Sequence, residues 1–372
     1  MKKKVVSVLL AAAMTTTLVA GCGSTGAADT AADTSAEETT ESTDDTEADA
    51  ADAEETANAG ATYKVAVVKQ MDHASLDEIA NAVEEELDAI AAKNGVTIEY
   101  ETYSGQGDQS VLNQIGTQVV SEDVDVIIPI ATLAAQVMAN CAEETQTPVV
   151  YAAISDPDAA ELTGIDYVTG TSDALNTDFI MDMMFKQNPD VQKVGLLYSL
   201  SEANSTKPIA DAKAYLDEKG IAYEEKTAST NDEVITAASA LVADGVDAVF
   251  TPTDNTIMTA ELSIYEKFIE AGIPHYTGAD SFALNGAFVG YGVDYANLGQ
   301  KTADMIADIL VDGADPSSTK VETFDNGTAT VNTETCEALG LDLETIKKDF
   351  EPLCTQVNEI TTAESFDDVE AK

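Results

Sequence analysis

Short polar side chains recur at the points where predicted strands give way to helices. Seven such loops hold candidate ligand contacts, among them Ser75, Thr132, Asp156, Asn204, Asp254, Asn255 and Asp280. The first backbone N–H groups of a helix have no partner within the helix, so these positions suit an anionic group of a small ligand. Each residue taken singly is better explained as a helix cap. The recurrence of the pattern in loop after loop favours a binding cleft.

The chain contains no arginine, which excludes a guanidinium clamp on a ligand carboxylate. Hydroxyl and backbone N–H groups must then hold a carboxylate. Our candidates are Ser75 and Thr132, together with the amides of Leu133 and Ala134 at a predicted helix start.

A ligand ammonium would need an ionised carboxylate as its partner. Asp156, Asp254 and Asp280 compete for that role, with Asp254 and Asp280 preferred because both follow strands of the second predicted domain. Asn204 and Asn255 would add hydrogen bonds from the same domain. Four aromatic residues near strand ends either wall an apolar pocket or pack in the core: Tyr103, Tyr151, Tyr198 and Phe282.

Motifs for catalysis are missing from the sequence. There is no G-x-S-x-G nucleophile elbow and no phosphate-binding loop, since Gly105-Gln-Gly107 lacks the third glycine. His73 falls in a candidate cleft loop and is better explained as a ligand contact or a cap, while His275 is expected to be structural. We therefore expect a binding protein that needs no cofactor and no metal, and not an enzyme.

Charge narrows the choice of partners further. The 372 residues include 18 lysines against 68 acidic residues, a formal net charge of −50. Such a surface repels nucleic acid.

Beyond Cys22 the chain has three cysteines. Cys141 is expected to be a core thiol, and a disulfide between Cys336 and Cys354 is left open.

The N-terminus has the pattern of an export signal. Lysines at positions 2–4 precede a short apolar run, and Val19-Ala20-Gly21-Cys22 resembles the lipobox of bacterial lipoproteins. We expect a signal peptide at 1–21, a lipid on Cys22, and an acidic, disordered tether over 22–61. The mature protein would then be anchored at the outer face of the cytoplasmic membrane.

From residue 63 onward strand and helix patterns alternate in two series. Strands are predicted at 63–69, 96–103, 124–130, 148–153, 193–198, 221–227, 248–251 and 274–277. Helices are predicted at 75–94, 109–120, 133–143, 175–187, 206–219, 230–243 and 257–271, the first with a capping box from Ser75 to Glu78. This alternation predicts an α/β protein with two doubly wound parallel-sheet domains.

At its loops the chain is similar to the solute-binding proteins of ABC importers, more narrowly to the subfamily for tryptophan, tyrosine or other amino acids. The resemblance rests on the segments MDHASLDEI, SGQGDQSVLNQI, ATLAAQ, AAISDP, YSLSEANS, PTDNT, GADS and YGVDYANLG. It implies a type I periplasmic-binding-protein fold whose two lobes are joined by a hinge. The lobes would comprise 62–172 with 288–315 and 173–287 with 316–355, followed by an acidic tail at 356–372. The crossings would lie near 170–173, 281–287 and 315.

The resemblance implies a monomeric receptor that delivers a small ligand, an aromatic or branched-chain amino acid, to an ABC permease and its ATPase. Two alternatives remain open at this point. One is a sugar or other neutral solute, and the other is a sensor that presents its ligand-bound form to a receptor kinase.

Overall fold

The computed structural model describes residues 60–324 and 327–370. The expected signal peptide, Cys22 and the expected tether up to residue 59 lie outside the described residues. Within these two ranges, no helix is both long and apolar enough to cross a membrane.

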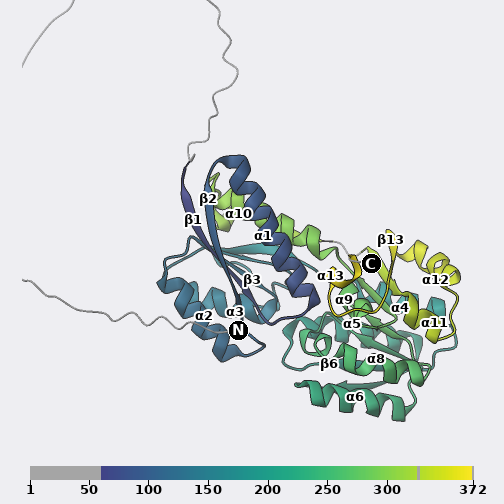
Figure 1. Cartoon of the computed structure of the whole chain (residues 1–372). Helices are drawn as coiled ribbons and strands as arrows, with labels where there is room; N and C mark the ends of the chain where they lie inside the picture. The colour runs from purple at the N-terminus through teal and green to yellow at the C-terminus, as the bar shows by residue number, and fades with distance from the viewer. Residues whose placement is uncertain (1–59, 325–326, 371–372) are drawn as a thin grey trace, which may run out of the picture. The chain divides into compact units, whose positions relative to one another are not determined.

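A six-stranded parallel sheet forms the first lobe, in the order β11-β5-β4-β3-β1-β2 (Figure 1). Its strands are β1 (Thr62–Lys69), β2 (Thr97–Ser104), β3 (Val126–Ile130), β4 (Val149–Tyr151), β5 (Val168–Ser172) and β11 (Glu322–Thr323). Its helices are α1 (Ala74–Asn94), α2 (Gln109–Ser121), α3 (Thr132–Ala142) and α10 (Tyr295–Leu310), and a 3₁₀ turn, η1 (Pro316–Ser318), precedes β11.

Helices cover both faces of this sheet. Side chains alternate between the faces of a strand, so Val67 and Ile128 belong to the core under α1 and α10. Their neighbours Ala66 and Ile127 belong to the core under α2 and α3. Two covered faces require strands that are apolar throughout, which explains the sequence of β3, VIIPI.

A seven-stranded sheet forms the second lobe, in the order β13-β12-β10-β9-β8-β6-β7. Its strands are β6 (Lys193–Tyr198), β7 (Ala222–Thr227), β8 (Ala248–Thr251), β9 (His275–Thr277), β10 (Val289–Gly292), β12 (Thr328–Asn332) and β13 (Gln356–Ile360). Its longer helices are α4 (Thr177–Gln187), α5 (Ala203–Lys219), α6 (Asn231–Asp244) and α8 (Glu261–Glu270). Its shorter helices are α7 (Asn255–Met258), α9 (Asp280–Leu284), α11 (Thr333–Ala338), α12 (Leu343–Phe350), η2 (Glu351–Leu353) and α13 (Phe366–Glu370). The prediction of two α/β domains with parallel sheets is thus confirmed, with the single antiparallel pairing β10–β12 among the described strands.

Strand pairing moves two of the expected lobe boundaries. We placed 288–315 in the first lobe, yet β10 pairs with β9 and β12 in the second sheet. The chain therefore returns to the first lobe between β10 and α10. We placed 316–355 in the second lobe, yet β11 pairs with β5 of the first sheet, so the last crossing falls after residue 323.

The expected acidic tail at 356–372 is also wrong in its first part, because β13 pairs with β12 over residues 356–360. Strands β11 and β13 are short and lie at the edges of their sheets, and their backbone groups find partners that are distant in sequence. Local patterns therefore do not reveal them.

Two helix predictions also differ in detail. In place of the predicted helix 257–271 the chain forms two helices, the short α7, which Asp254 caps, and α8. Helix α1 begins one residue before Ser75, with His73 at its N-cap, so the predicted capping box does not form.

The cysteines beyond Cys22 have free thiols. The Sγ atom of Cys336 lies 3.7 Å from the Leu341 carbonyl, and that of Cys354 lies 3.2 Å from the Phe350 carbonyl. The pairing left open between them is absent.

Helix α10 is fixed against α1 at Gly299. A Cβ atom there would lie 2.7 Å from the Ile79 carbonyl and 2.8 Å from the Ala82 methyl. On the other side, Thr302 Oγ1 lies 2.8 Å from Thr171 Oγ1 of β5. This close approach positions Tyr295, at the start of α10, beside the end of β5.

We expect Gly299→Val to lower the free energy of unfolding by about 1–3 kcal/mol, because the added methyl groups overpack the α1–α10 contact. Urea denaturation followed by circular dichroism measures the change. The control is Gln300→Val on the exposed side of the same helix. Equal losses in the two variants would contradict the close-packing argument.

Candidate ligand-binding site

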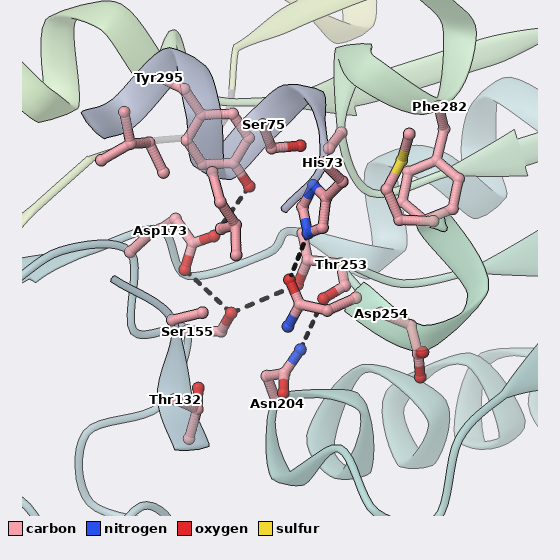
Figure 2. A pocket seen from close by; sticks show the side chains of 17 residues that line it. His73, Ser75, Thr132, Ser155, Asp173, Asn204, Thr253, Asp254, Phe282 and Tyr295 are labelled. Atoms are coloured by element: carbon pink, nitrogen blue, oxygen red, sulfur yellow. Dashed lines mark hydrogen bonds between the residues drawn. The ribbon is translucent and has the colours of Figure 1, made fainter. Parts of the chain in front are cut away.

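A pocket lies where the carboxyl ends of strands from both sheets meet (Figure 2). Six of the predicted site residues line it: Ser75, Thr132, Asn204, Asp254, Asn255 and Phe282. They come from both lobes, so the structure brings together side chains up to about two hundred positions apart in sequence.

The other predicted site residues lie outside the pocket lining. The Leu133 N–H donates to Gln70 Oε1 at 2.9 Å, and Ala134 is buried in the core under α2 and α3. Asp156 accepts from the Ala159 N–H in its own loop. Tyr151 and Tyr103 pack in the first lobe.

Two further candidates have other environments. The Tyr198 hydroxyl donates to Glu225 Oε2 at 2.9 Å. Asp280 begins α9, and its Oδ1 atom is buried without a hydrogen-bond partner among the described residues. Burial, with a smaller contribution from the charge of Asp294, raises the pKa of Asp280 to about 7.

Asp254 lines the pocket, but its carboxylate is already occupied. Oδ2 accepts from the Ser199 N–H and the Ser205 hydroxyl, each at 2.7 Å, and Oδ1 accepts from the Ile257 N–H at 3.0 Å. Burial raises its pKa despite these bonds. Asp254 therefore joins β6, α5 and α7 within the second lobe and has little capacity left for a ligand.

Asp173, which sequence reasoning missed, is the carboxylate better placed to meet a cation. It follows β5 and is 4% exposed. Its Oδ1 accepts from Ser155 Oγ at 2.9 Å, and its Oδ2 accepts from the Tyr295 hydroxyl at 3.0 Å (Figure 2). Burial raises its pKa. Among the described residues no lysine forms an ion pair with it, so both bonds come from neutral hydroxyls.

Backbone strain also marks this pocket. Ala131 has φ 75° and Ala153 has φ 58°, a left-handed conformation that alanine rarely adopts. The two residues follow β3 and β4, and both line the pocket. Strained residues cluster at ligand-binding loops, where the surrounding structure holds them in place.

Hydrogen bonds across the pocket join the two lobes. Ser75 Oγ on α1 bonds to Ser281 Oγ on α9. Ser155 Oγ, after β4, lies 3.3 Å from Thr253 Oγ1, after β8. His73 Nε2 lies 3.0 Å from Asn255 Oδ1.

The contact between His73 and Asn255 belongs to a longer chain that ends on Glu202. This carboxylate accepts from Asn255 Nδ2 at 2.9 Å, from Gln70 Nε2 at 3.0 Å and from Thr256 Oγ1 at 3.3 Å. An ionised Glu202 only accepts, so the Asn255 NH₂ faces it and the Asn255 carbonyl oxygen faces His73. His73 Nε2 is therefore the donor in their contact.

Burial sets the protonation of both ends of this chain. It lowers the pKa of His73 to about 4, so the imidazole is neutral at pH 7. It raises the pKa of Glu202 to about 7, helped by the nearby charge of Asp254. With Nε2 protonated, the neutral imidazole of His73 has an unprotonated Nδ1.

The free space between the pocket side chains is about 20 Å³. That is room for about one water molecule. An amino acid therefore enters only if the lobes or the side chains of the pocket wall, such as Met258 and Phe282, move apart.

The missed residues carried a usable signal. Ser155 and Thr253 occur in the loops AAISDP and PTDNT, and Tyr295 occurs in YGVDYANLG. Asp173 follows a strand like the other candidates, but β5 reads VTGTS and lacks an apolar pattern. The sequence therefore predicts no strand at 168–172, and Asp173 does not stand out as a residue that follows a strand.

Two α/β lobes with a polar pocket at their strand ends define the class of two-lobed, type I solute-binding proteins. The family model for ABC transporter substrate-binding proteins matches residues 64–348. The chain belongs to this family, which consists of solute-binding receptors and not of enzymes.

Similar proteins support this assignment. A tyrosine-binding protein of Clostridioides difficile is 28% identical over 282 residues, which cover 74% of this chain and 81% of that protein. The crystal structure of an ABC domain from Streptococcus pneumonia in complex with L-Trp is 29% identical, with a TM-score of 0.72 over 80% of this chain and 100% of that one. A ligand-free, open substrate-binding protein with adhesive properties from Clostridium difficile is 26% identical, with a TM-score of 0.59 over 81% and 100% of the chains.

We expect Glu202→Gln to flatten the pH dependence of stability between about pH 4.5 and 7. An acid whose pKa is raised by folding binds more protons in the folded state. Its stabilising contribution is therefore full below about pH 4.5 and is lost as the pH rises through about 7. Relative to the variant, the parent should lose up to about 3 kcal/mol across this range.

Urea denaturation at pH 4.5, 6, 7 and 8 measures this difference. Glu270→Gln, at the exposed end of α8, is the control and should keep the pH dependence of the parent. Parallel curves for Glu202→Gln and the parent would show that Glu202 does not titrate in this range.

Proposed function

We propose that the chain captures an α-amino acid with an aromatic or branched side chain between its lobes and delivers it to an ABC permease. The observation that carries the proposal is the buried carboxylate of Asp173 in the pocket wall, which accepts from two neutral hydroxyls and has no cationic partner among the described residues. A buried carboxylate without a positive partner is costly, and a ligand ammonium would supply that partner.

The rest of the pocket suits the other two parts of an amino acid. The hydroxyls of Ser75 and Thr132, both buried and both near the start of a helix, would hold the carboxylate. Leu76, Ile79, Met258 and Phe282 provide an apolar wall. The tyrosine named for one relative and the L-Trp bound to another agree with this division of the pocket.

Delivery and anchoring complete the proposal. We propose that the protein works at the outer face of the cytoplasmic membrane, held by a lipid on Cys22, and that its permease recognises the ligand-bound arrangement of the lobes. Membership in the substrate-binding family of ABC transporters supports this role.

We expect Asp173→Asn to weaken amino-acid binding by roughly 30-fold to several thousand-fold, because about 2–5 kcal/mol is lost when one member of a buried charge pair is removed. A thermal-shift screen of amino acids and sugars first identifies the ligand, since binding to the folded state raises the Tm. Isothermal titration calorimetry then compares the parent and the variant.

The control is Asp156→Asn, in a loop outside the pocket, which should bind like the parent. Binding by Asp173→Asn within threefold of the parent would exclude an ammonium at this carboxylate. A Tm raised only by sugars would favour the neutral-solute alternative.

We expect Cys22→Ser to release the protein into the medium or to leave its signal peptide uncleaved, because the serine cannot carry a thioether-linked lipid. Detergent partition and the mass of the N-terminal peptide measure the outcome. Full retention of the variant in the detergent phase would contradict lipid anchoring.

A further inference from the structure

We propose that Glu202 is a positioning residue of the pocket, whose protonation decides, through Asn255, which ring nitrogen of His73 carries the proton. When Glu202 takes up a proton, His73 Nδ1 changes from a hydrogen-bond acceptor to a donor. The inference goes beyond the proposed function, because it concerns the ligand-free protein and does not depend on the identity of the ligand.

Glu202 connects a groove at the surface to the ligand pocket. Its side chain lines a groove of about 440 Å³ between loops of both lobes, which include Gly107 and Thr230. His73 lines the ligand pocket (Figure 2), and so does Asn255. A proton exchanged with solvent at Glu202 can therefore affect a side chain that borders the ligand space.

The amide of Gln70 holds one oxygen of Glu202 as an acceptor. Gln70 Oε1 accepts from the Leu133 N–H at 2.9 Å, and a backbone N–H only donates, so the orientation of the amide is set. Its Nε2 therefore donates to Glu202 Oε1, at 3.0 Å. Thr256 Oγ1 lies 3.3 Å from the same oxygen, which is long for an O–H···O hydrogen bond. A proton added to Glu202 is therefore better accommodated on Oε2.

The other oxygen of Glu202 faces an amide that can turn over. Asn255 Nδ2 donates to Oε2 at 2.9 Å, and Asn255 Oδ1 accepts from His73 Nε2 at 3.0 Å. A proton on Oε2 needs an acceptor, so Asn255 then presents its carbonyl to Glu202 and its NH₂ to His73. Nε2 must accept from that NH₂, and the single proton of the neutral imidazole is then on Nδ1.

The surroundings of His73 permit either tautomer. Nδ1 is buried without a hydrogen-bond partner among the described residues, so no protein contact there favours one form. The charged groups near the imidazole are Lys69, Asp77 and Asp72, of which Asp72 also borders the groove of Glu202. Lys69 forms ion pairs with both aspartates, so the three charges partly offset one another. Burial dominates and lowers the pKa of His73 to about 4, so the ring stays neutral at pH 5.5 and above.

Asp254 is the charged group that acts on Glu202 from the start of α7. Burial, with a smaller contribution from the charge of Asp254, raises the pKa of Glu202 to about 7. Asp254 itself accepts from the Ser199 N–H on one oxygen and from the Ile257 N–H on the other, and neither donor can reverse. A proton taken up by this pair of carboxylates therefore goes to Glu202, and we expect the exchange of tautomers near pH 7.

Nuclear magnetic resonance of the ligand-free protein tests the proposal. The chain has two histidines, and long-range ¹H–¹⁵N correlation spectra of protein labelled with [¹⁵N]histidine show which ring nitrogen of each carries the proton. The spectrum of His73→Gln assigns the signals. We expect the Nε2–H tautomer of His73 at pH 8.5 and the Nδ1–H tautomer at pH 5.5. The same tautomer at both pH values, or an imidazolium at pH 5.5, overturns the proposal.

Two variants test whether Glu202 is the source of the exchange. Glu202→Gln should hold the Nδ1–H tautomer at both pH values, because Gln70 attracts the carbonyl of the new amide and leaves its NH₂ to face Asn255. Asn255→Ala removes the link, and the tautomer should then no longer follow the pH. A pH-driven exchange that persists in either folded variant overturns the proposal.

The matched control is Glu270→Gln, at the exposed end of α8, which should exchange tautomers as the parent does. Thermal melts at both pH values confirm that each variant is folded, and the titration of the parent decides the proposal where a variant is not. Failure of this proposal leaves the proposed function intact, because the Asp173→Asn titration tests that function separately.

Discussion

Buried carboxylates without cations are the constraint on which the loops around the pocket depend. Asp173, Glu202 and Asp254 are each at most 6% exposed. The chain has no arginine, and no lysine pairs with any of the three among the described residues. A buried charge is tolerated only if it is hydrogen-bonded. Hydroxyls, amides and backbone N–H groups supply these bonds, and they tie together the loops that carry the pocket.

The three carboxylates differ in how many of their bonds are already made. Asp254 accepts two backbone N–H groups and one hydroxyl from its own lobe. Glu202 accepts two side-chain amides and one hydroxyl, and one of the amides comes from the opposite lobe. Asp173 accepts two hydroxyls, and from the backbone it receives only its own N–H. Asp254 and Glu202 each accept three donors, and they differ in whether a donor comes from the opposite lobe. Asp173 accepts fewer bonds from other residues than either of them, which makes it the candidate ligand group.

The sequence was sufficient for the architecture because the signals for it are local. Apolar runs such as VIIPI and helices with a periodic apolar face predict parallel sheets covered on both sides. The lobe boundaries depend instead on β10, β11 and β13, which are two to five residues long. Their place is decided by backbone pairing between distant segments, and no local pattern records that pairing.

The site was predictable as a set of loops but not as a set of roles. Asp254 and Asp173 both follow strands, and their residue type is the same. Asp254 turns back to cap α7, whereas Asp173 faces Ser155 and Tyr295 in the pocket. The rotamer of such an aspartate decides whether it caps a helix or faces the pocket. That rotamer depends on neighbouring side chains and backbone groups that only the folded structure brings close. For this reason the post-strand rule groups the loops that line the pocket but does not rank its carboxylates.

The hydrogen bonds between the lobes across the pocket reduce the net affinity for a ligand that has to break them. Ser75 with Ser281, His73 with Asn255 and Ser155 with Thr253 join the lobes through groups that also line or border the ligand space. With about 20 Å³ free between them, a ligand gains its bonds only after some of these are broken or lengthened. Its net affinity is then the difference between its own contacts and those it displaces. The Asp173 carboxylate takes no part in the three contacts between the lobes that are named above. A ligand ammonium that pairs with Asp173 therefore adds an interaction without breaking one of those contacts.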